Sequence, residues 1–254
     1  MPNVVDVSKS IKFSSGNTIE LSPKSELDFK KCLRDKKLIY QIYEMEICKL
    51  NLSLIYIAML GLKMATDPRW VNIVEKNIEE ILVDHAFCEQ KAASNAISII
   101  VQYPHYTDIV QAMTAICKEE MEHFDLVHQK LLERGLTLGF ERKDTYVNDL
   151  SEYLRRNKTN STPDGMFVNK MLFAAMIEAR SCERFKILSE ELKDEDLKLF
   201  YRSLMESEAR HYTTFLGFAR KYSKGINVDK CWQEFLEFEA GLMKKYGKSE
   251  TMHG

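Results

Sequence analysis

Two copies of the motif Glu-x-x-His, each preceded by a further glutamate, are the residues of this chain whose types and spacing indicate chemistry. The motifs occupy residues 120–123 and 208–211 and begin 88 residues apart. Glu89 precedes the first motif by 31 residues, and Glu178 precedes the second by 30. Residues three apart share one face of a helix, so each motif can bind one metal ion through both side chains. Four carboxylates and two imidazoles from four helices are the ligand set of a two-iron site inside a helical bundle.

The spacing of these residues also fits two antiparallel helical hairpins. In such a hairpin, residues equidistant from the turn lie at one level. The midpoint of Glu89 and Glu120 falls in a Tyr-Pro-His segment, which predicts the end of a helix. The midpoint of Glu178 and Glu208 is residue 193, in a Lys-Asp pair that predicts the second turn. Both hairpins therefore bring their candidate ligands level with one another.

The candidate ligands interrupt helix faces that are otherwise mostly apolar. Glu120 lies in line with Met113, Ile116 and Val127, and the helices that carry Glu89 and Glu208 show the same kind of face. An ionised carboxylate buried without a partner costs roughly several kcal/mol. Three helices with such an interruption therefore predict a shared cluster around bound cations.

The third helix of the bundle offers two glutamates for the same role. Glu183 matches Glu89 in a local Cys-Glu pattern, but Lys186 and Glu190 on its face indicate a more solvated surface. Glu178 instead shares a line with apolar residues, which favours it as the ligand. Glu183 stays open as the alternative.

Composition and helix signals predict an all-α fold. Of 254 residues, 45% are hydrophobic and only 10 are glycine and 5 proline, which favours long helices. We expect a ferritin-like four-helix bundle of two helical hairpins with a long crossover, plus extra N- and C-terminal helices. The expected domains are an N-terminal extension, 1–66, of an irregular segment and a helix, and a di-iron domain with the C-terminal helix, 67–254.

Local signals give the expected elements within these domains. Residues 1–23 are expected to be mostly irregular, with room for a short strand pair. Asp67 and Asp194 are expected to cap helix N-termini. The expected helices span residues 25–65, 67–102, 107–134, 144–156, 164–192, 194–222 and 229–246.

Charge and cysteine content narrow the functional classes. A net charge of −2 shows no overall basic excess of the kind that marks non-specific nucleic-acid binding. The six cysteines form no Cys-x-x-Cys pair, which weighs against a zinc ribbon or a rubredoxin centre. No secretory signal opens the chain, and the most apolar stretch, 50–62, is shorter than the about 20 residues that span a membrane. We therefore expect a cytoplasmic protein with reduced thiols and no membrane contact.

Some further residues lie near the candidate ligands in sequence. His85 is one turn before Glu89, where it would lie either beside the site or on the surface. Asp84 and Asp125 are candidates to orient a ligand histidine by a hydrogen bond. A third Glu-x-x-His motif, at residues 250–253, lies in a polar tail, and we assign it no function.

Four segments around the candidate ligands carry a resemblance to a known family. Residues 84–94, 118–124, 177–185 and 207–212 closely resemble the tRNA hydroxylase family that acts on 2-methylthio-N6-isopentenyladenosine. The run Glu-Ala-Arg-Ser-Cys-Glu-Arg-Phe in the third segment is the most specific. The resemblance covers about residues 67–223.

The resemblance implies a non-haem di-iron monooxygenase with O2 as co-substrate. Its substrate would be the modified adenosine next to the anticodon of tRNA, hydroxylated on the isopentenyl side chain. Two electrons would come from an external reductase, since the sequence has no flavin or nicotinamide fingerprint. The oligomeric state stays open. The residues that would hold the two iron ions are Glu89, Glu120, His123, Glu178, Glu208 and His211.

An RNA substrate also requires basic side chains on the protein surface. The alternative for each candidate is an ordinary solvated residue, and Arg180 and Arg210, which flank ligands, are also candidates to support the site. The candidates are Arg142, Lys143, Arg155, Arg156, Lys158, Arg180, Arg184 and Arg202.

Three other functions compete with this interpretation. The main one is a ferritin-like iron-oxidising protein, or another di-iron oxidase or binding protein, without a tRNA substrate. A rubrerythrin-like peroxidase would carry a four-cysteine iron centre, which this sequence lacks. A helical scaffold with a buried polar network is the third, and metal content separates it from the others.

Overall fold

The structure is a computed structural model that describes residues 10–12, 18–20, 60–246 and 251–252. The chain divides into two compact units, residues 1–59 and 60–254. In the first unit, β1 (Ser10–Lys12) pairs with β2 (Thr18–Glu20) in an antiparallel ribbon, which is the short strand pair allowed for above. The helix expected over 25–65, with its apolar stretch, lies almost entirely outside the described residues. The domain boundary expected at residue 66 stays a prediction.

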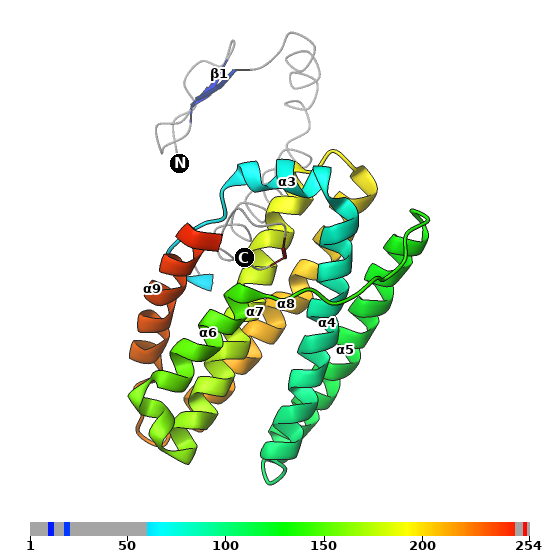
Figure 1. Ribbon diagram of the computed structural model, residues 1–254. Helices are drawn as coiled ribbons and strands as arrows, with labels where there is room; N and C mark the ends of the chain where they lie inside the picture. The colour runs from blue at the N-terminus through cyan, green and yellow to red at the C-terminus, as the bar shows by residue number, and fades with distance from the viewer. Residues whose placement is uncertain (1–9, 13–17, 21–59, 247–250, 253–254) are drawn as a thin grey trace, which may run out of the picture. The chain divides into compact units, whose positions relative to one another are not determined.

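Four long helices form the frame of the second unit (Figure 1). They make two hairpins, α4 with α5 and α7 with α8, so the predicted bundle of helical hairpins is confirmed. No helix of the described residues is long and apolar enough to cross a membrane. The four helices are α4 (Ile78–Gln102), α5 (Thr107–Leu132), α7 (Pro163–Glu191) and α8 (Glu195–Lys221).

Side-chain caps fix where the long helices of the second hairpin begin. The Asp194 carboxylate accepts hydrogen bonds from the backbone N–H groups of Asp196 and Leu197, as its predicted role as a cap requires. Thr162 caps α7 in the same way by accepting from Gly165 N–H. Because the Asp194 cap lies in the turn between α7 and α8, it helps to fix the level at which residues of the two helices meet, whereas Thr162 fixes the far end of α7.

The helix expected over residues 67–102 is broken in the structure. It consists of η1 (Pro68–Trp70), α3 (Val71–Lys76) and α4, which are separated at Asn77. Asn77 leaves the helical region, with φ −134° and ψ 41°, and its side chain donates to the carbonyl of Ile73 at 2.9 Å. An Asn side chain offers the backbone a local alternative to the helical hydrogen bond, which explains the break. The Asp67 side chain accepts from Arg69 N–H at the start of this segment, near its expected capping position.

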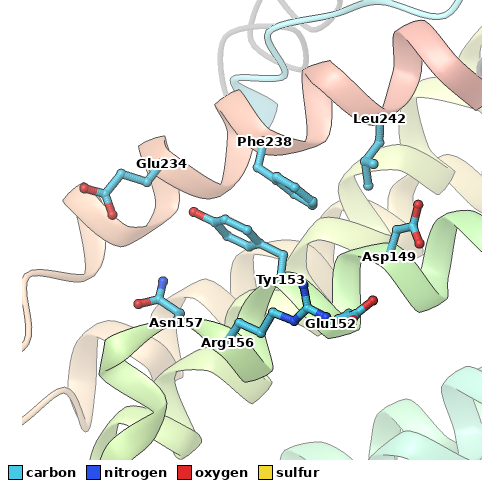
Figure 2. A pocket seen from close by; sticks show the side chains of 8 residues that line it. All are labelled: Asp149, Glu152, Tyr153, Arg156, Asn157, Glu234, Phe238 and Leu242. Atoms are coloured by element: carbon cyan, nitrogen blue, oxygen red, sulfur yellow. Dashed lines mark hydrogen bonds and ion pairs between the residues drawn. The ribbon is translucent and has the colours of Figure 1, made fainter.

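The crossover from α5 to α7 carries α6 (Thr145–Arg156) and η2 (Lys158–Ser161). The last helix, α9 (Val228–Tyr246), packs on α6 and α7. Figure 2 shows Tyr153 of α6 facing Phe238 of α9, and their rings stack with centroids 4.0 Å apart. α6 and α9 therefore cover the α7 side of the bundle. They correspond to the crossover and C-terminal helices expected from the sequence.

A buried ion-pair network joins α7 to α9 and α6. Glu239 and Arg180 are both fully buried, and their side chains approach to 2.6 Å. Tyr146 donates to the same Glu239 oxygen at 2.9 Å. Burial alone lowers the pKa of Arg180, but the Glu239 and Glu183 carboxylates reverse the effect and raise it. The guanidinium therefore stays charged and holds three helices together.

This burial corrects two of the RNA-contact candidates. Arg180 and Arg184 are both 0% exposed, so neither can reach an RNA surface. Arg184 lies over the Trp70 ring at 4.2 Å and donates to the carbonyl of Thr251. The interpretation of Arg180 and Arg184 as surface contacts is therefore wrong, because partners distant in sequence satisfy their charge.

We predict that Glu239→Ala lowers the free energy of unfolding by about 3–5 kcal/mol, because it leaves the Arg180 guanidinium buried without its main partner. Chemical denaturation followed by circular dichroism measures this loss. Glu237→Ala, an exposed position on the same helix, is the matched control and should change stability by less than about 0.5 kcal/mol. Equal effects of the two substitutions would show that the network does not stabilise the fold.

Candidate metal centre

All six candidate ligands meet in the interior of the four-helix bundle. They form two overlapping groups whose potential ligand atoms lie within 4.8 Å of one another. One group is Glu89, Glu120, His123 and Glu208, and the other is Glu120, Glu178, Glu208 and His211. Glu120 of α5 and Glu208 of α8 belong to both groups, so they lie between the two imidazoles.

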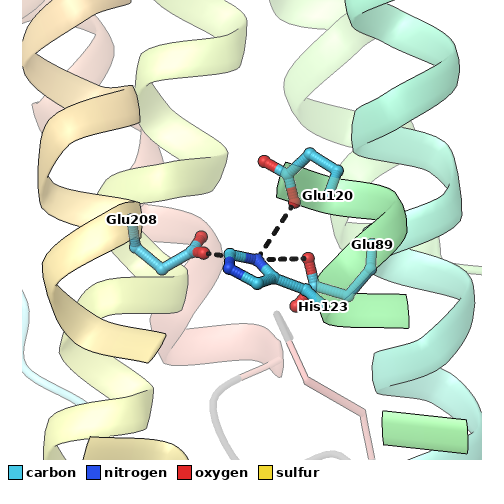
Figure 3. A group of neighbouring side chains, drawn as sticks. All are labelled: Glu89, Glu120, His123 and Glu208. Atoms are coloured by element: carbon cyan, nitrogen blue, oxygen red, sulfur yellow. Dashed lines mark ion pairs between the residues drawn. The ribbon is translucent and has the colours of Figure 1, made fainter. Parts of the chain in front are cut away.

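The first group gathers around His123 (Figure 3). Its Nδ1 atom lies 3.7 Å from Glu89, 3.6 Å from Glu120 and 3.5 Å from Glu208. These carboxylates come from α4, α5 and α8. Three helices therefore direct oxygen atoms at one imidazole nitrogen, which is the arrangement that one cation would bind.

The second group gathers around His211. Its Nδ1 atom lies 2.8 Å from Glu120 and 3.9 Å from Glu178 of α7. Glu183, the rival of Glu178, accepts hydrogen bonds from the backbone and hydroxyl of Thr66 and from Arg180. The structure thus brings Glu178 into the cluster and engages Glu183 elsewhere.

The cluster is buried and leaves polar atoms without hydrogen bonds. Each of the six residues is at most 7% exposed. The His211 Nδ1 and Glu120 Oε1 atoms are close, but their contact does not have the geometry of a hydrogen bond. Both carboxylate oxygens of Glu120, Oε1 of Glu208 and the Nδ1 atoms of His123 and His211 therefore form no hydrogen bond among the described residues. Buried polar atoms in that state are costly unless a cation satisfies them. Carboxylate oxygens with imidazole nitrogens suit a metal such as iron or manganese.

Burial and mutual proximity shift the proton affinities of these groups. Burial raises the pKa of Glu208 to about 8, and the nearby Glu120 and Glu89 carboxylates add to the rise. Burial also raises the pKa of Glu178 well above its ordinary value. Burial lowers the pKa of His123, but the carboxylates of Glu120 and Glu89 outweigh it and raise that pKa to about 11. A cation entering the cluster would therefore compete with bound protons.

The two imidazoles are oriented by residues of the opposite hairpin. The Nε2 atom of His211 lies 2.9 Å from the Glu119 carboxylate, which also accepts from Arg210 at 2.6 Å. The Nε2 atom of His123 lies 3.2 Å from the Ser207 hydroxyl. Glu119 and Ser207 each directly precede the glutamate of one motif and contact the histidine of the other. Such partners fix the ring orientation of a metal-binding histidine.

These contacts correct the residues expected to orient the ligands. Asp84 accepts from the backbone N–H of Met252 at 2.6 Å, and Asp125 is exposed, so the hypothesis for both is wrong. The sequence signal for Glu119 is its position next to a ligand, but the contact with His211 arises only when the two hairpins pack. His85, left open above, is fully buried, and its Nε2 lies 2.6 Å from Glu89.

Among the hollows of the described residues, size and contact with the cluster do not go together. A hollow of about 610 Å³ lies between α6 and α9 and is lined by residues such as Tyr153 and Phe238 (Figure 2). None of the six cluster residues lines it. A much smaller hollow, about 10 Å³, is lined by Glu89, Glu120 and Glu208 among others. Size therefore does not identify the reactive site in this fold.

Comparisons with known proteins agree with this geometry. A curated relative from Pseudomonas putida, named tRNA 2-(methylsulfanyl)-N(6)-isopentenyladenosine(37) hydroxylase, is 35% identical over 74% of this chain and 89% of its own length. A relative of the same name from Salmonella typhimurium is 27% identical over 70% of this chain and 81% of its own.

A solved structure supports the fold. It is described as Protein 43 with aldehyde deformylating oxygenase activity from Synechococcus, and it matches 76% of this chain and 95% of its own at 29% identity and a TM-score of 0.65. The expected ferritin-like fold class is confirmed. The family model described as tRNA-(MS[2]IO[6]A)-hydroxylase (MiaE) matches residues 54–254. The chain therefore belongs to the MiaE family of tRNA hydroxylases.

Proposed function

We propose that this protein is an O2-dependent di-iron monooxygenase of tRNA. Its substrate is 2-methylthio-N6-isopentenyladenosine next to the anticodon, and the reaction adds a hydroxyl group to the isopentenyl side chain. The observation that carries the proposal is the buried group of four carboxylates and two imidazoles in a chain of this family. The proposed compartment is the cytoplasm, where the tRNA substrate would be met.

The two overlapping groups of side chains suggest how two iron ions would be held. Glu89 and His123 would hold one ion, and Glu178 and His211 the other. Glu120 and Glu208, which belong to both groups, would be shared. The atoms without hydrogen bonds in Glu120 and Glu208 support this assignment. The position of Glu183 against Thr66 and Arg180 favours Glu178 as the ligand of α7.

The iron ions, when bound, would supply the activation of O2 that hydroxylation of an unactivated C–H bond requires. The protein's own part is to orient the ligands and to keep water away. Glu119, Ser207 and His85 hold the ligand side chains through hydrogen bonds. Fully buried apolar residues such as Ala93 and Met113 exclude solvent around the cluster.

Two partners belong to this proposal. Electrons come from a separate reductase, since the sequence shows no nucleotide fingerprint. The exposed candidates for tRNA contacts are Lys143, Arg155, Arg156 and Arg202, of which Arg156 is paired with Glu152. The side chain of the candidate Lys158 lies outside the described residues. Arg142 is engaged with Glu80 at 2.7 Å.

The function is tested by the fate of the modified nucleoside. Ferrous-loaded protein with O2, a reductant and tRNA bearing 2-methylthio-N6-isopentenyladenosine should add one oxygen atom, detected by nucleoside mass analysis. Glu120→Ala and His211→Ala should lose both bound iron and product, because each removes a ligand. Glu122→Ala, an exposed position on α5, should keep both. A wild-type protein that binds iron and oxidises it but never modifies tRNA would favour the iron-oxidising alternative.

We predict that Glu119→Ala weakens metal binding or hydroxylation by about 10–100-fold, since His211 loses the carboxylate that orients it. Metal titration and turnover measurements on purified protein give the two values. Glu206→Ala, which removes an exposed carboxylate on α8, serves as the control and should have little effect. Wild-type affinity and turnover in Glu119→Ala would rule out the orienting role.

Metal affinity should increase with pH. The carboxylates around the imidazoles raise the pKa of His211 to about 9 and that of His123 to about 11, against the opposing effect of burial. Both imidazoles therefore carry protons near neutral pH and must release them to bind a metal. Titration with Co²⁺ at about pH 6 and about pH 8 should show proton release and about tenfold tighter binding per pH unit for each proton released. An affinity independent of pH would contradict the protonation pattern.

A further inference from the structure

The small hollow at the cluster adjoins a second hollow that leads away from it between α4 and α7. The second hollow has a volume of about 80 Å³. The two share four lining residues, two from α4 and two from α7: Cys88, Ala92, Ile177 and Glu178. Because Glu178 is one of the candidate ligands, the outer hollow ends at the proposed iron site.

The lining of the outer hollow is mostly apolar, with a few polar side chains. Val147 of α6 and Phe173, Ala174 and Ile177 of α7 supply most of the wall. Its polar lining residues are Lys91 and Asn95 of α4, the buried Asp144 and the candidate ligand Glu178. A site of this kind suits an apolar group attached to a polar one. The modified adenosine of the proposed function has that form, with a branched hydrocarbon tail on a purine.

The two volumes fit different parts of that reaction. A cavity needs roughly 10–15 Å³ to hold one water-sized group. The outer hollow, at about 80 Å³, has room for roughly five to eight such groups, the size range of a five-carbon tail. The inner hollow, at about 10 Å³, has room for only one small molecule beside the ligands. A tail in the outer hollow would thus end next to the cluster without displacing its side chains.

The larger hollow between α6 and α9 does not offer this combination. Asp149, Glu152 and Glu234 line it, and Arg156 is paired with Glu152 (Figure 2). None of the cluster residues lines that hollow, so a group bound there would not meet the proposed iron site. At the outer hollow, the lining residue Lys91 is likewise paired, with the exposed Glu141 at 2.8 Å. What distinguishes the outer hollow is therefore its contact with Glu178 of the cluster, not its charge.

We propose that the hollow between α4 and α7 binds the isopentenyl tail of the substrate and that Ala92 and Ile177 set the size of tail that reaches the iron site. This inference rests on the proposed function. Both side chains line both hollows, so they stand at the junction where the tail would pass. Ala92 contributes only a methyl group there, and a longer side chain at this position would close the path.

The test is to fill the junction and to measure two activities separately. Ala92→Leu should lower kcat/KM for tRNA bearing 2-methylthio-N6-isopentenyladenosine by about tenfold or more. Bound iron and the rate of ferrous oxidation by O2 without tRNA should stay at wild-type values, because the ligands are untouched. Ser94→Leu, at an exposed position on the same helix, introduces the same side chain and should leave kcat/KM unchanged.

A second variant separates a blocked path from a disturbed fold. Ala92→Leu combined with Ile177→Ala returns volume to the same junction and should restore kcat/KM to within about threefold of wild type. A purely structural effect of the leucine would not be rescued by removing a second buried side chain.

Three results would overturn the inference. Wild-type kcat/KM in Ala92→Leu would show that the tail takes another route. Equal slowing of ferrous oxidation without tRNA would identify the hollow as a path for O2. Absence of product with the wild-type protein would overturn the proposed function, and the inference with it. An active wild type together with unaffected variants would overturn the inference alone.

Discussion

Placing four carboxylates and two imidazoles inside a helical bundle is the constraint on which the rest of this structure depends. Ionisable groups in an apolar interior are costly, and the cost falls only if they share protons or bind a cation. Every long helix contributes at least one of the six, so the helices cannot shift along one another without breaking the group. The cap at Asp194 and the close hairpin turns hold the helices at that level.

The two hairpins are similar in sequence, and each also supplies a residue that supports the histidine of the other. Glu119 of the first hairpin orients the histidine of the second, and Ser207 of the second contacts the histidine of the first. The two partners differ chemically, since a carboxylate makes its imidazole a stronger electron donor than a hydroxyl does. The two halves of the site are therefore similar in geometry and different in electrostatics. The hollow between α4 and α7 also adjoins the site next to Glu178 of α7.

Spacing predicted most of the fold and the membership of the cluster, because helix period and hairpin turns are local properties. The apolar line through Glu178 pointed to the same side chain that the structure brings to His211. Other features depend on partners distant in sequence, and these were missed. Arg180 and Arg184 looked like surface charges, but Glu239 of α9 and Thr251 near the C-terminus satisfy them. The break at Asn77 was missed because a single Asn within a helical pattern is a weak signal.

The central claim is that two iron ions occupy the space between the two imidazoles, with Glu120 and Glu208 shared. Its most direct test is anomalous X-ray scattering at the iron edge from crystals of ferrous-loaded protein. The account predicts two peaks enclosed by the six side chains, each with one histidine and with Glu178 as the ligand of α7. A single peak, a peak beside Glu183, or no peak within the cluster would contradict it.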